Sequence, residues 1–413
     1  MKIADTSTPV VVLHCGLGAL SIMRTLGYLG IEVAGVSENP QAPALRSRYC
    51  RKKFLVPFHE LSSAEFVDQL LEIRKKFATN PILIATSDET AITVAEHFDR
   101  LSSAFRIGQN AGSLVHRLAD KMEMFKLAQD HGVPTPTTIL PTTLGEAQNY
   151  AQSMNYPAML KGAMGNRLYE RTGKKMVVVE SANELLEQYK LLQDPDVPNL
   201  MIQELIPGGD DQVYIFNGYF NAKSDCLAAF TGRKIRQYPV HVGCASLGEC
   251  CWVQAVADET TAFMKRIGYR GILDIGYRKD PRDGKYKVLD INPRVGQAFR
   301  LFISEHNLDV VRALYLDLTG QSVPQDDQAR EGRRWMIEDF DVVSCIHYAQ
   351  EGSLSFLGWI RSFKHLQEGA WFSLRDPLPF FDMLGRLALQ TFNWLRKRIT
   401  GTAENPVQVA NGR

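Results

Sequence analysis

A short acidic hairpin near position 280 is the clearest pattern of apolar and polar residues in this chain. Residues 271–277 (GILDIGY) and 286–292 (YKVLDIN) alternate apolar and polar side chains, as half-buried strands do. The stretch between them, 279–285 (KDPRDGK), is rich in Asp, Pro and Gly, which is typical of a turn. The pattern therefore predicts two antiparallel strands joined by a tight connection.

The predicted hairpin gathers polar side chains on one face. Successive side chains of a strand point to opposite faces, so Asp274 faces away from its apolar neighbours. The same rule puts Val288, Asp290 and Asn292 on one face of the returning strand. Hard oxygen ligands of this kind suit Mg²⁺ held together with substrate phosphates, and Arg294 could reach a phosphate or a carboxylate. The competing interpretation is an ordinary exposed polar face.

The first 110 residues alternate short apolar runs with stretches of helix length. Such alternation is typical of βαβ units, which form parallel sheets. We therefore expect an open parallel sheet with helices on both faces. The predicted strands are 10–13, 31–36 and 81–86, and the predicted helices are 19–29 and one that Ser87–Thr90 caps and that runs to about Leu101.

The length of 413 residues allows two or three domains. A polar stretch at 321–332 is typical of a linker and suggests a boundary. We expect an N-terminal α/β domain at 1–110, a second domain at 111–320 with α+β subdomains 111–205 and 206–320, and a C-terminal extension at 321–413.

The composition is that of a soluble globular protein, with 45% hydrophobic and 23% charged residues and a formal net charge of +1. Nucleic-acid proteins usually show a basic excess, so no nucleic-acid partner is expected. The seven cysteines form no CxxC pair, which favours reduced thiols in a cytoplasmic protein. The chain starts without a signal-peptide pattern, and it lacks the run of about 18 apolar residues that a membrane span requires.

Two further segments have groups suited to a nucleotide. The predicted strand 156–161 (YPAMLK) ends in a lysine and is followed by a glycine-containing loop, where ammonium and backbone N–H groups can surround phosphate oxygens. Residues 200–211 (LMIQELIPGGDD) form an apolar strand that turns into an acidic, glycine-rich hinge. Such a strand edge can present backbone groups to an adenine and an acid to ribose hydroxyls.

Together these segments resemble the ATP-grasp superfamily over roughly residues 10–320. The order is an open α/β domain, then DKMEMFKLAQDHGVPTP, YPAMLK, MIQELIPGGDD and LDIGYRKDPRDGKYKVLDINPR. Within the superfamily the chain is most similar to carboxylate–amine ligases of the D-aspartate-ligase-like type, and FTGRKIRQYPVHVGCAS at 230–246 adds to this likeness. The resemblance implies a pre-ATP-grasp domain and a two-subdomain ATP-grasp domain, before a mostly helical C-terminal extension.

The resemblance also implies roles for individual residues. Lys121 and Lys161 would contact the phosphates of ATP, and Lys174 or Lys175 would lie on a loop that covers them. Gln203, Glu204 and Ile206 would hold the adenine. Asp210 or Asp211 would bind the ribose. For catalysis, the implied contacts are Asp274, Asp290 and Asn292 with Mg²⁺ (or Mn²⁺), and Arg294 with the acyl phosphate. Two features depart from the family pattern: Asp290 stands where Glu is more usual, and the loop after Lys161 is long and carries Arg167 and Arg171.

These roles imply a ligase that joins a carboxylate, such as an amino acid or small peptide, to an amine through an acyl phosphate. Within the same fold, the alternatives are a carboxylase, a thiol ligase or a nucleotide-binding regulatory protein without turnover. An oxidoreductase that uses NAD is a further alternative, suggested by Gly16-Leu17-Gly18 after a strand, but Ser21 stands at the position of the third fingerprint glycine.

Other charged residues have two interpretations each. Arg233 opens a basic segment that is either a clamp for the activated carboxylate or a solvated face. Asp88 and Glu89 follow a predicted parallel strand, where they either cap a helix or contact a ligand.

Apolar residues recur at helical spacing between Phe380 and Ile399, with basic residues among them. This helix either packs on the protein body, which we favour, or makes peripheral contact with a membrane. A homodimer is a further expectation.

Overall fold

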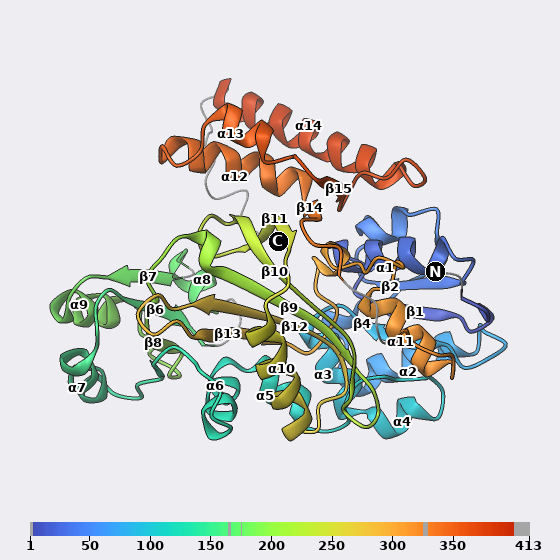
Figure 1. The fold of residues 1–413 in the computed structure, drawn as a ribbon, viewed down its shortest axis with the longest axis horizontal. Coiled ribbons are helices and arrows are strands. Elements are labelled where there is room, and N and C mark those ends of the chain that lie inside the picture. Colours follow the sequence, from blue (N-terminus) through green and yellow to red (C-terminus); the bar gives the residue numbers. More distant parts are fainter. Residues whose placement is uncertain (1–2, 164–166, 175, 325–328, 400–413) are drawn as a thin grey trace.

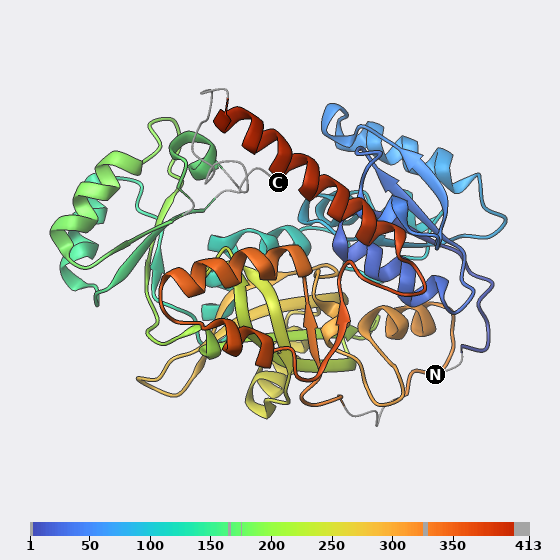
Figure 2. The same ribbon diagram turned by 90° about the horizontal axis from the view of Figure 1, so that it is seen from above.

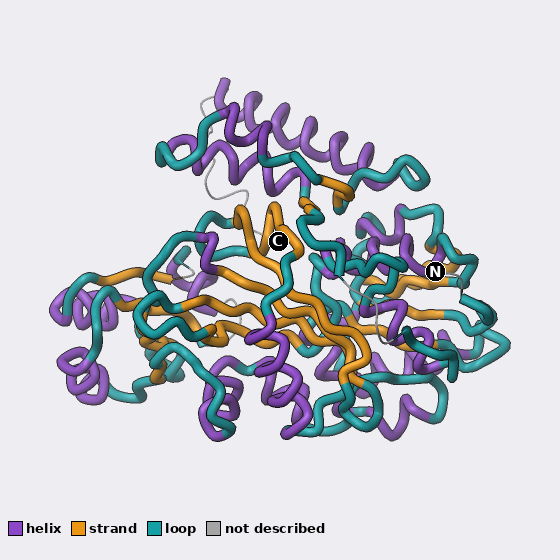
Figure 3. The backbone as a smooth tube through the Cα atoms, in the orientation of Figure 1, coloured by secondary structure: helices purple, strands orange, loops and turns teal. Residues whose placement is uncertain are grey.

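The chain folds around three β-sheets (Figure 1). The computed structural model describes residues 3–163, 167–174, 176–324 and 329–399, with side chains as far as residue 393. One sheet lies in the N-terminal part and one in the first predicted subdomain, while the largest lies between them (Figure 3). The mixed α/β architecture expected from the sequence is confirmed.

The N-terminal sheet has four parallel strands in the order β3-β2-β1-β4, as the alternation of strands and helices predicts. All side chains of β1, β2 and β4 are buried, which explains their uninterrupted apolar sequences. The edge strand β3 escapes prediction because exposed Arg51 and Lys53 interrupt it. The elements are β1 (Val10–Leu13), α1 (Leu17–Gly27), β2 (Val33–Ser37), η1 (Pro43–Arg46), β3 (Cys50–Leu55), η2 (Phe58–Glu60), α2 (Ser63–Arg74), β4 (Ile82–Ala85), α3 (Asp88–Glu96) and α4 (Phe98–Ser102).

The second sheet is antiparallel, with the strand order β5-β8-β6-β7. The helix α6 begins after Asp120, whose side chain caps it by accepting a hydrogen bond from the backbone N–H of Glu123. The elements are α5 (Leu114–Ala119), α6 (Lys121–Asp130), β5 (Thr138–Ile139), α7 (Leu144–Ser153), β6 (Ala158–Gly162), α8 (Arg167–Thr172), β7 (Met176–Val179), α9 (Ala182–Leu192) and β8 (Leu200–Glu204).

The central sheet has seven strands in the order β13-β12-β9-β10-β11-β14-β15. Its first five strands pair antiparallel and come from the second predicted subdomain. The elements of this part are η3 (Asp210–Gln212), β9 (Val213–Phe220), β10 (Cys226–Tyr238), β11 (Cys244–Cys250), α10 (Gln254–Arg266), β12 (Gly271–Lys279), β13 (Tyr286–Asn292), η4 (Phe299–Leu301) and α11 (Val310–Leu318).

The predicted acidic hairpin is β12–β13, but its returning strand contains a bulge. Asp290 is opposite Gly276, whereas Val288 is opposite Tyr277, so Leu289 is an extra residue in β13. A bulge reverses the alternation of side chains beyond it. Val288 is therefore buried in the apolar core with Tyr277, and the prediction that it shares a face with Asp290 is wrong.

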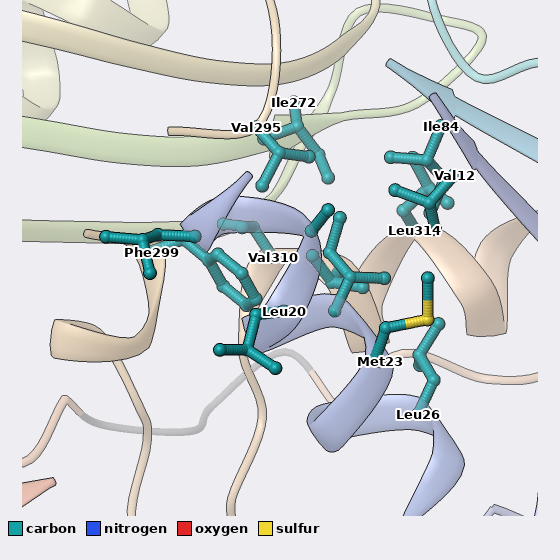
Figure 4. Close-up of a cluster of buried hydrophobic side chains, with 14 of the residues drawn as sticks. Val12, Leu20, Met23, Leu26, Ile84, Ile272, Val295, Phe299, Val310 and Leu314 are labelled. Carbon is teal, nitrogen blue, oxygen red and sulfur yellow. The ribbon is translucent and has the colours of Figure 1, made fainter. Parts of the chain in front are cut away.

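The N-terminal domain and the central sheet share one hydrophobic core (Figure 4). Leu20 and Met23 of α1 lie in one buried cluster with Val310 and Leu314 of α11 and with Phe299. Gly18 at the start of α1 lies beside the backbone of Gly296, where even a Cβ would make ordinary van der Waals contact, 3.4 Å from its carbonyl oxygen. This packing fixes the carboxyl end of β1 beside the segment that follows the hairpin.

The C-terminal extension is helical, as expected, but it also lengthens the central sheet. β14 pairs antiparallel with β11 and parallel with β15, so the sheet crosses the boundary predicted at residue 320. Within the described residues, no helix combines the length and apolar character that crossing a bilayer requires. The elements are β14 (Arg334–Met336), α12 (Glu338–Gln350), α13 (Phe356–Arg361), β15 (Leu366–Gly369) and α14 (Leu378–Ile399).

Buried ion pairs fasten this extension to the N-terminal domain and to the sheet. The guanidinium of Arg24 in α1 lies 2.9 Å from the carboxylate of Asp376 and donates to the backbone oxygens of Ala370 and Trp371. Glu368 accepts from Arg300 at 2.8 Å and from Arg333 at 2.7 Å. These contacts connect three parts of the chain that lie far apart in the sequence.

We expect Asp376→Ala to lower the free energy of unfolding by about 3 kcal/mol, because it leaves a buried guanidinium without its counter-ion. Asp376 is 1% exposed. Urea denaturation followed by tryptophan fluorescence measures the effect. The control is Asp382→Ala, which breaks the more exposed pair with Arg46 and should cost about 1 kcal/mol or less. Equal losses in the two variants would refute the anchoring role of Asp376.

Candidate functional site

The hairpin brings Asp274, Asp290 and Asn292 together on one face, as predicted. Asn292 lies opposite Asp274, and its Nδ2 donates a hydrogen bond to Oδ2 of Asp290 at 2.9 Å. Two glycines make room for the carboxylates. A Cβ at Gly276 would lie 2.1 Å from Asp290 Oδ1, and one at Gly296 would lie 2.1 Å from Asp274 Oδ2. Both carboxylates therefore lie directly against backbone, and the sequence does not reveal the part played by these glycines.

The two carboxylates of this face are electrostatically unfavourable without a cation. Burial raises the pKa of Asp274 to about 6; Arg294 acts to lower it and the neighbouring Asp290 to raise it further. The described residues contain no group of three or more His, Cys, Asp or Glu side chains able to hold a metal ion. Two carboxylates and one amide oxygen instead suit Mg²⁺ that takes its remaining ligands from phosphates and water.

Lys121 and Lys161 lie together beside this face, although they come from different elements. Lys121 is the first residue of α6, and its Nζ donates to the backbone oxygen of Gly162 at 3.4 Å. Burial lowers the pKa of Lys161 to about 7; Lys121 lowers it further, while Asp290 acts to raise it. Burial also lowers the pKa of Lys121, again opposed by Asp290. Two buried ammonium groups side by side fit a polyanion such as a triphosphate.

In the hinge at the end of β8, the backbone is more available to a nucleotide base than the side chains are. Gln203 Nε2 donates to Thr138 Oγ1 at 2.6 Å. The carboxylate of Glu204 lies 3.0 Å from Lys287 and 3.1 Å from Arg282, so it is committed to ion pairs with the hairpin. Ile206 is buried, and its backbone N–H makes no hydrogen bond within the described chain. Of these three predicted adenine contacts, Ile206 has the free hydrogen-bonding group.

Asp210 and Asp211 have different surroundings. Asp210 accepts hydrogen bonds from Gln237 Nε2 at 2.9 Å and from the hydroxyl of Tyr348, and it lies 3.2 Å from His241 Nδ1. Tyr348 belongs to α12, so the C-terminal extension holds this carboxylate. The side chain of Asp211 is exposed and accepts from Gln212 at 3.0 Å. Of the two carboxylates, that of Asp211 is therefore the more accessible.

The covering loop is described only in part. Lys174 is exposed, whereas Lys175 lies outside the described residues. Arg167 and Arg171, which make this loop differ from the family pattern, lie 2.5 Å and 3.9 Å from the carboxylate of Asp194. That pairing gives both arginines a structural role on the first subdomain.

Arg294 joins the hairpin to the N-terminal domain. Its Nε donates to Asp88 Oδ1 at 2.8 Å, and its Nη2 donates to Asn292 Oδ1 at 3.1 Å. Ser87 caps α3 with its side chain, so the neighbouring Asp88 is available for this ion pair. Asp88 is thus connected to the candidate site through its ion pair with Arg294. It follows the carboxyl end of β4, which is the end of a parallel sheet where ligands usually bind.

Arg233 and Lys234 point to opposite faces of the central sheet. Arg233 is aligned with Tyr214 and Tyr277 across three strands, on the face away from Asp274, and it lies 2.8 Å from Glu249. Lys234 lies on the face of Asp274, where, together with Arg294, it acts against the rise that burial causes in the pKa of Asp274. The Nζ of Lys234 donates to the backbone oxygen of Gly243 at 2.8 Å. The strand therefore turns Lys234, and not the predicted Arg233, toward the site.

No protein-family model matches the chain. Among curated proteins, it is 22% identical to the D-aspartate ligase of Enterococcus faecium over 292 residues, which are 66% of this chain and 68% of that protein. It is 23% identical to the carbamoyl phosphate synthase large chain of Gemmatimonas aurantiaca over 83% of this chain, but it spans 31% of that longer protein.

Solved structures share the fold. The ADP complex of N5-carboxyaminoimidazole ribonucleotide synthetase has a TM-score of 0.61 at 12% identity, covering 81% of this chain and 82% of that one. The L-amino acid ligase of Bacillus licheniformis has a TM-score of 0.55 at 15% identity, covering 76% and 75%. These similarities agree with the order of elements described above. The chain therefore shares the fold of these ligases, as its resemblance to the ATP-grasp superfamily predicts.

Proposed function

We propose that this protein is an ATP-dependent ligase that joins a carboxylate to an amine through an acyl phosphate. The observation that carries the proposal is the meeting of Lys121 and Lys161 with the acidic face of the hairpin. Cations for the phosphates and ligands for a metal ion lie beside one another there. Similarity to a D-aspartate ligase and to an L-amino acid ligase supports amino acids or small peptides as substrates.

The proposed reaction has two steps. An oxygen of the substrate carboxylate attacks the γ-phosphorus of ATP, the bond to the β,γ-bridging oxygen breaks, and ADP leaves. The amine then attacks the carbonyl carbon of the acyl phosphate, phosphate leaves, and the amine nitrogen loses a proton. The protein needs no nucleophile of its own, because positioning and electrostatic stabilisation supply the catalysis.

The residues of the chain would hold the reactants as follows. Lys121 and Lys161 would neutralise phosphate oxygens, and the backbone of Ile206 would contact the adenine. Asp274, Asp290 and Asn292 would hold Mg²⁺, which when bound screens the negative charge between carboxylate and phosphate. Arg294 would orient the transferring group, and its pairing with Asp88 limits where that guanidinium can move.

We also propose that Lys234 holds the substrate carboxylate, a role that the sequence suggested for Arg233. Its ammonium shares the face of Asp274, and Arg233 points to the opposite face. An ammonium that faces the metal ligands can neutralise an incoming carboxylate there.

We expect Lys234→Ala to lower kcat/KM for the carboxylate about a hundredfold, with a smaller change in the Kd of ATP. Steady-state kinetics and isothermal titration calorimetry separate the two effects. Arg233→Ala is the matched control, because it removes a neighbouring cation from the other face, and it should stay within about threefold of the wild type. A larger loss in the Arg233 variant would restore the role suggested by the sequence.

We expect ATP binding to take up a proton. The pKa of Lys161 is about 7 in the free protein, so above that pH the side chain is largely neutral. A bound polyphosphate favours the ammonium form and raises this pKa, so affinity should fall as the pH rises from 7 toward 9. Calorimetry in buffers of different ionisation enthalpy measures the proton uptake. If the Lys161→Met variant takes up the same number of protons when ATP binds, the uptake belongs to another group.

The substrates can be found by measuring phosphate release from Mg-ATP with amino acids and small peptides, singly and in pairs. Bicarbonate and thiols belong in the same panel, since a carboxylase or thiol ligase would respond to them. Release that requires a carboxylate and an amine, with the coupled product seen by mass spectrometry, supports the proposal. Response to bicarbonate or a thiol alone would replace it.

The remaining expectations also stay proposals. They are the domain boundaries at residues 110, 205 and 320, a cytoplasmic location and a homodimer. Limited proteolysis tests the domain boundaries, and light scattering tests the homodimer.

A further inference from the structure

The C-terminal helix α14 is docked at its start and exposed beyond it. Met383 is buried and Phe380 is partly buried against the body. Phe381 is 60% exposed, and further along Leu384 is 43% and Phe392 is 62% exposed. Figures 1 and 2 show α12, α13 and α14 in a layer apart from the three sheets, with α14 extending away from its attachment beside the N-terminal domain.

Four of the exposed apolar residues of α14 form one stripe, while Leu387 and Leu389 are exposed on other sides of the helix. Phe381, Leu384, Ala388 and Phe392 follow one another at intervals of three and four residues, which puts them on one side of a helix. Over these residues the stripe is about 17 Å long. The side that packs on the body carries Met383, so the stripe faces away from it. Packing of α14 on the body, the interpretation favoured from the sequence, thus holds for one side of the helix, and the other side is exposed.

The helix α13, which lies on the other side of α12 from α14 in Figure 2, also carries large exposed apolar side chains. Phe356, Leu357 and Ile360 are 69%, 64% and 46% exposed. Exposed apolar residues scattered singly need no explanation, but this many on two short segments indicate a surface that binds something.

Charge indicates what the layer binds. Residues 352–399 contain seven Lys and Arg but three Asp and Glu, although the whole chain has a net charge of +1. All three acids are neutralised by arginines of the body: Glu368 by Arg300 and Arg333, Asp376 by Arg24, and Asp382 by Arg46.

Two basic residues of the segment, both in or next to α13, differ from these acids. Arg361 and Lys364 are exposed, and neither forms an ion pair with any described carboxylate. Arg361 and Lys364 therefore add exposed positive charge next to the exposed apolar side chains of α13.

We propose that α13 and α14 bind the surface of a membrane that contains anionic lipids. The stripe on α14 would enter the boundary between headgroups and acyl chains, and the basic residues would lie among the phosphates. A second copy fits less well, because a two-fold interface would bring two positive layers together. The contact is peripheral, and it is independent of the proposed ligase activity.

Flotation of the full-length protein with lipid vesicles tests this inference. We expect binding to vesicles of equal parts phosphatidylcholine and phosphatidylglycerol, about tenfold weaker binding to phosphatidylcholine alone, and loss of the difference in high salt. The double variant Phe381→Ser, Phe392→Ser should lose about tenfold in binding to the anionic vesicles. Arg361→Glu with Lys364→Glu should weaken the same binding, because each basic residue near the surface contributes about fivefold.

The matched control is Leu191→Ser, which removes an apolar side chain that is 65% exposed on α9. It should bind vesicles like the wild type. Unchanged urea denaturation shows that the variants remain folded. Absence of vesicle binding, or equal binding by the stripe variant, would overturn the proposal. If light scattering shows that the wild type is a dimer and the stripe variant is a monomer, the stripe binds a second copy of the chain instead.

Discussion

Asp290→Asn should reduce ADP formation by about a hundredfold or more while the protein stays folded. Asp290 lies over Gly276 on the same face as Asp274, and the substitution removes one of the two negative charges available to a divalent cation. An amide is nearly isosteric, so the carboxylate's place against the backbone remains filled. Removing the charge also relieves repulsion with Asp274, so the unliganded variant should unfold at the same or a higher urea concentration.

The control for this prediction is Asp283→Asn in the turn of the same hairpin. Asp283 is 40% exposed and accepts from the backbone N–H of Lys285, a contact that an amide oxygen preserves. This variant should retain nearly wild-type turnover. Full activity of Asp290→Asn, measured at saturating and at limiting Mg²⁺, would rule out Asp290 as a metal ligand.

Lys161→Met should weaken ATP binding on the order of a hundredfold, because it removes the amine that would carry a positive charge against the phosphates in the proposed site. Calorimetry measures the Kd. Lys126→Met on α6 is the control, since Lys126 is exposed on that helix and should not affect affinity. ATP binding of equal strength in both variants would separate Lys161 from the nucleotide site.

The same substitution should change the pH dependence of stability. The pKa of Lys161 is about 7 in the folded protein and about 10.5 ordinarily, so the unfolded chain binds more protons between these values. Stability of the wild type therefore rises with pH across this window, and the burial of a charged ammonium is most costly below pH 7. Lys161→Met should lose this rise and should be more stable than the wild type at pH 6. Parallel stability curves would contradict the buried position of the ammonium.

Local patterns were enough to predict much of this fold. The uninterrupted apolar strands β1 and β4 are recognisable because both of their faces are buried. The acidic hairpin is recognisable because its alternation and its turn agree. The order of these segments along the chain carries the resemblance to the ATP-grasp superfamily, and the solved structures share the resulting fold.

The features that escape prediction depend on single-residue shifts. The extra residue Leu289 reverses the alternation in β13, and no turn residue marks it in the sequence. On β10, shifts of register occur around Arg236, so counting from either end does not reveal which of Arg233 and Lys234 faces the site. A shift by one residue therefore decides on which face of the sheet a side chain such as Val288 or Lys234 lies.

Other features depend on partners far away in the sequence. Asp210 resembles a free ribose ligand in its local segment, yet Tyr348 of α12 occupies its carboxylate. Arg294 pairs with Asp88 of the N-terminal domain, which lies 206 positions earlier. The short strands β14 and β15 are stable because β11 provides an edge for pairing, and their own sequences carry little sign of it.

Transfer of oxygen from the carboxylate to phosphate tests the proposed chemistry most directly. A carboxylate substrate identified by the phosphate-release panel would be labelled with ¹⁸O in both carboxyl oxygens and joined to its amine in unlabelled water. The account predicts one labelled oxygen in each released phosphate, because the acyl phosphate forms through a carboxylate oxygen. Unlabelled phosphate, with both labelled oxygens kept in the carboxylate or the label exchanged with water, would contradict activation of the carboxylate by ATP.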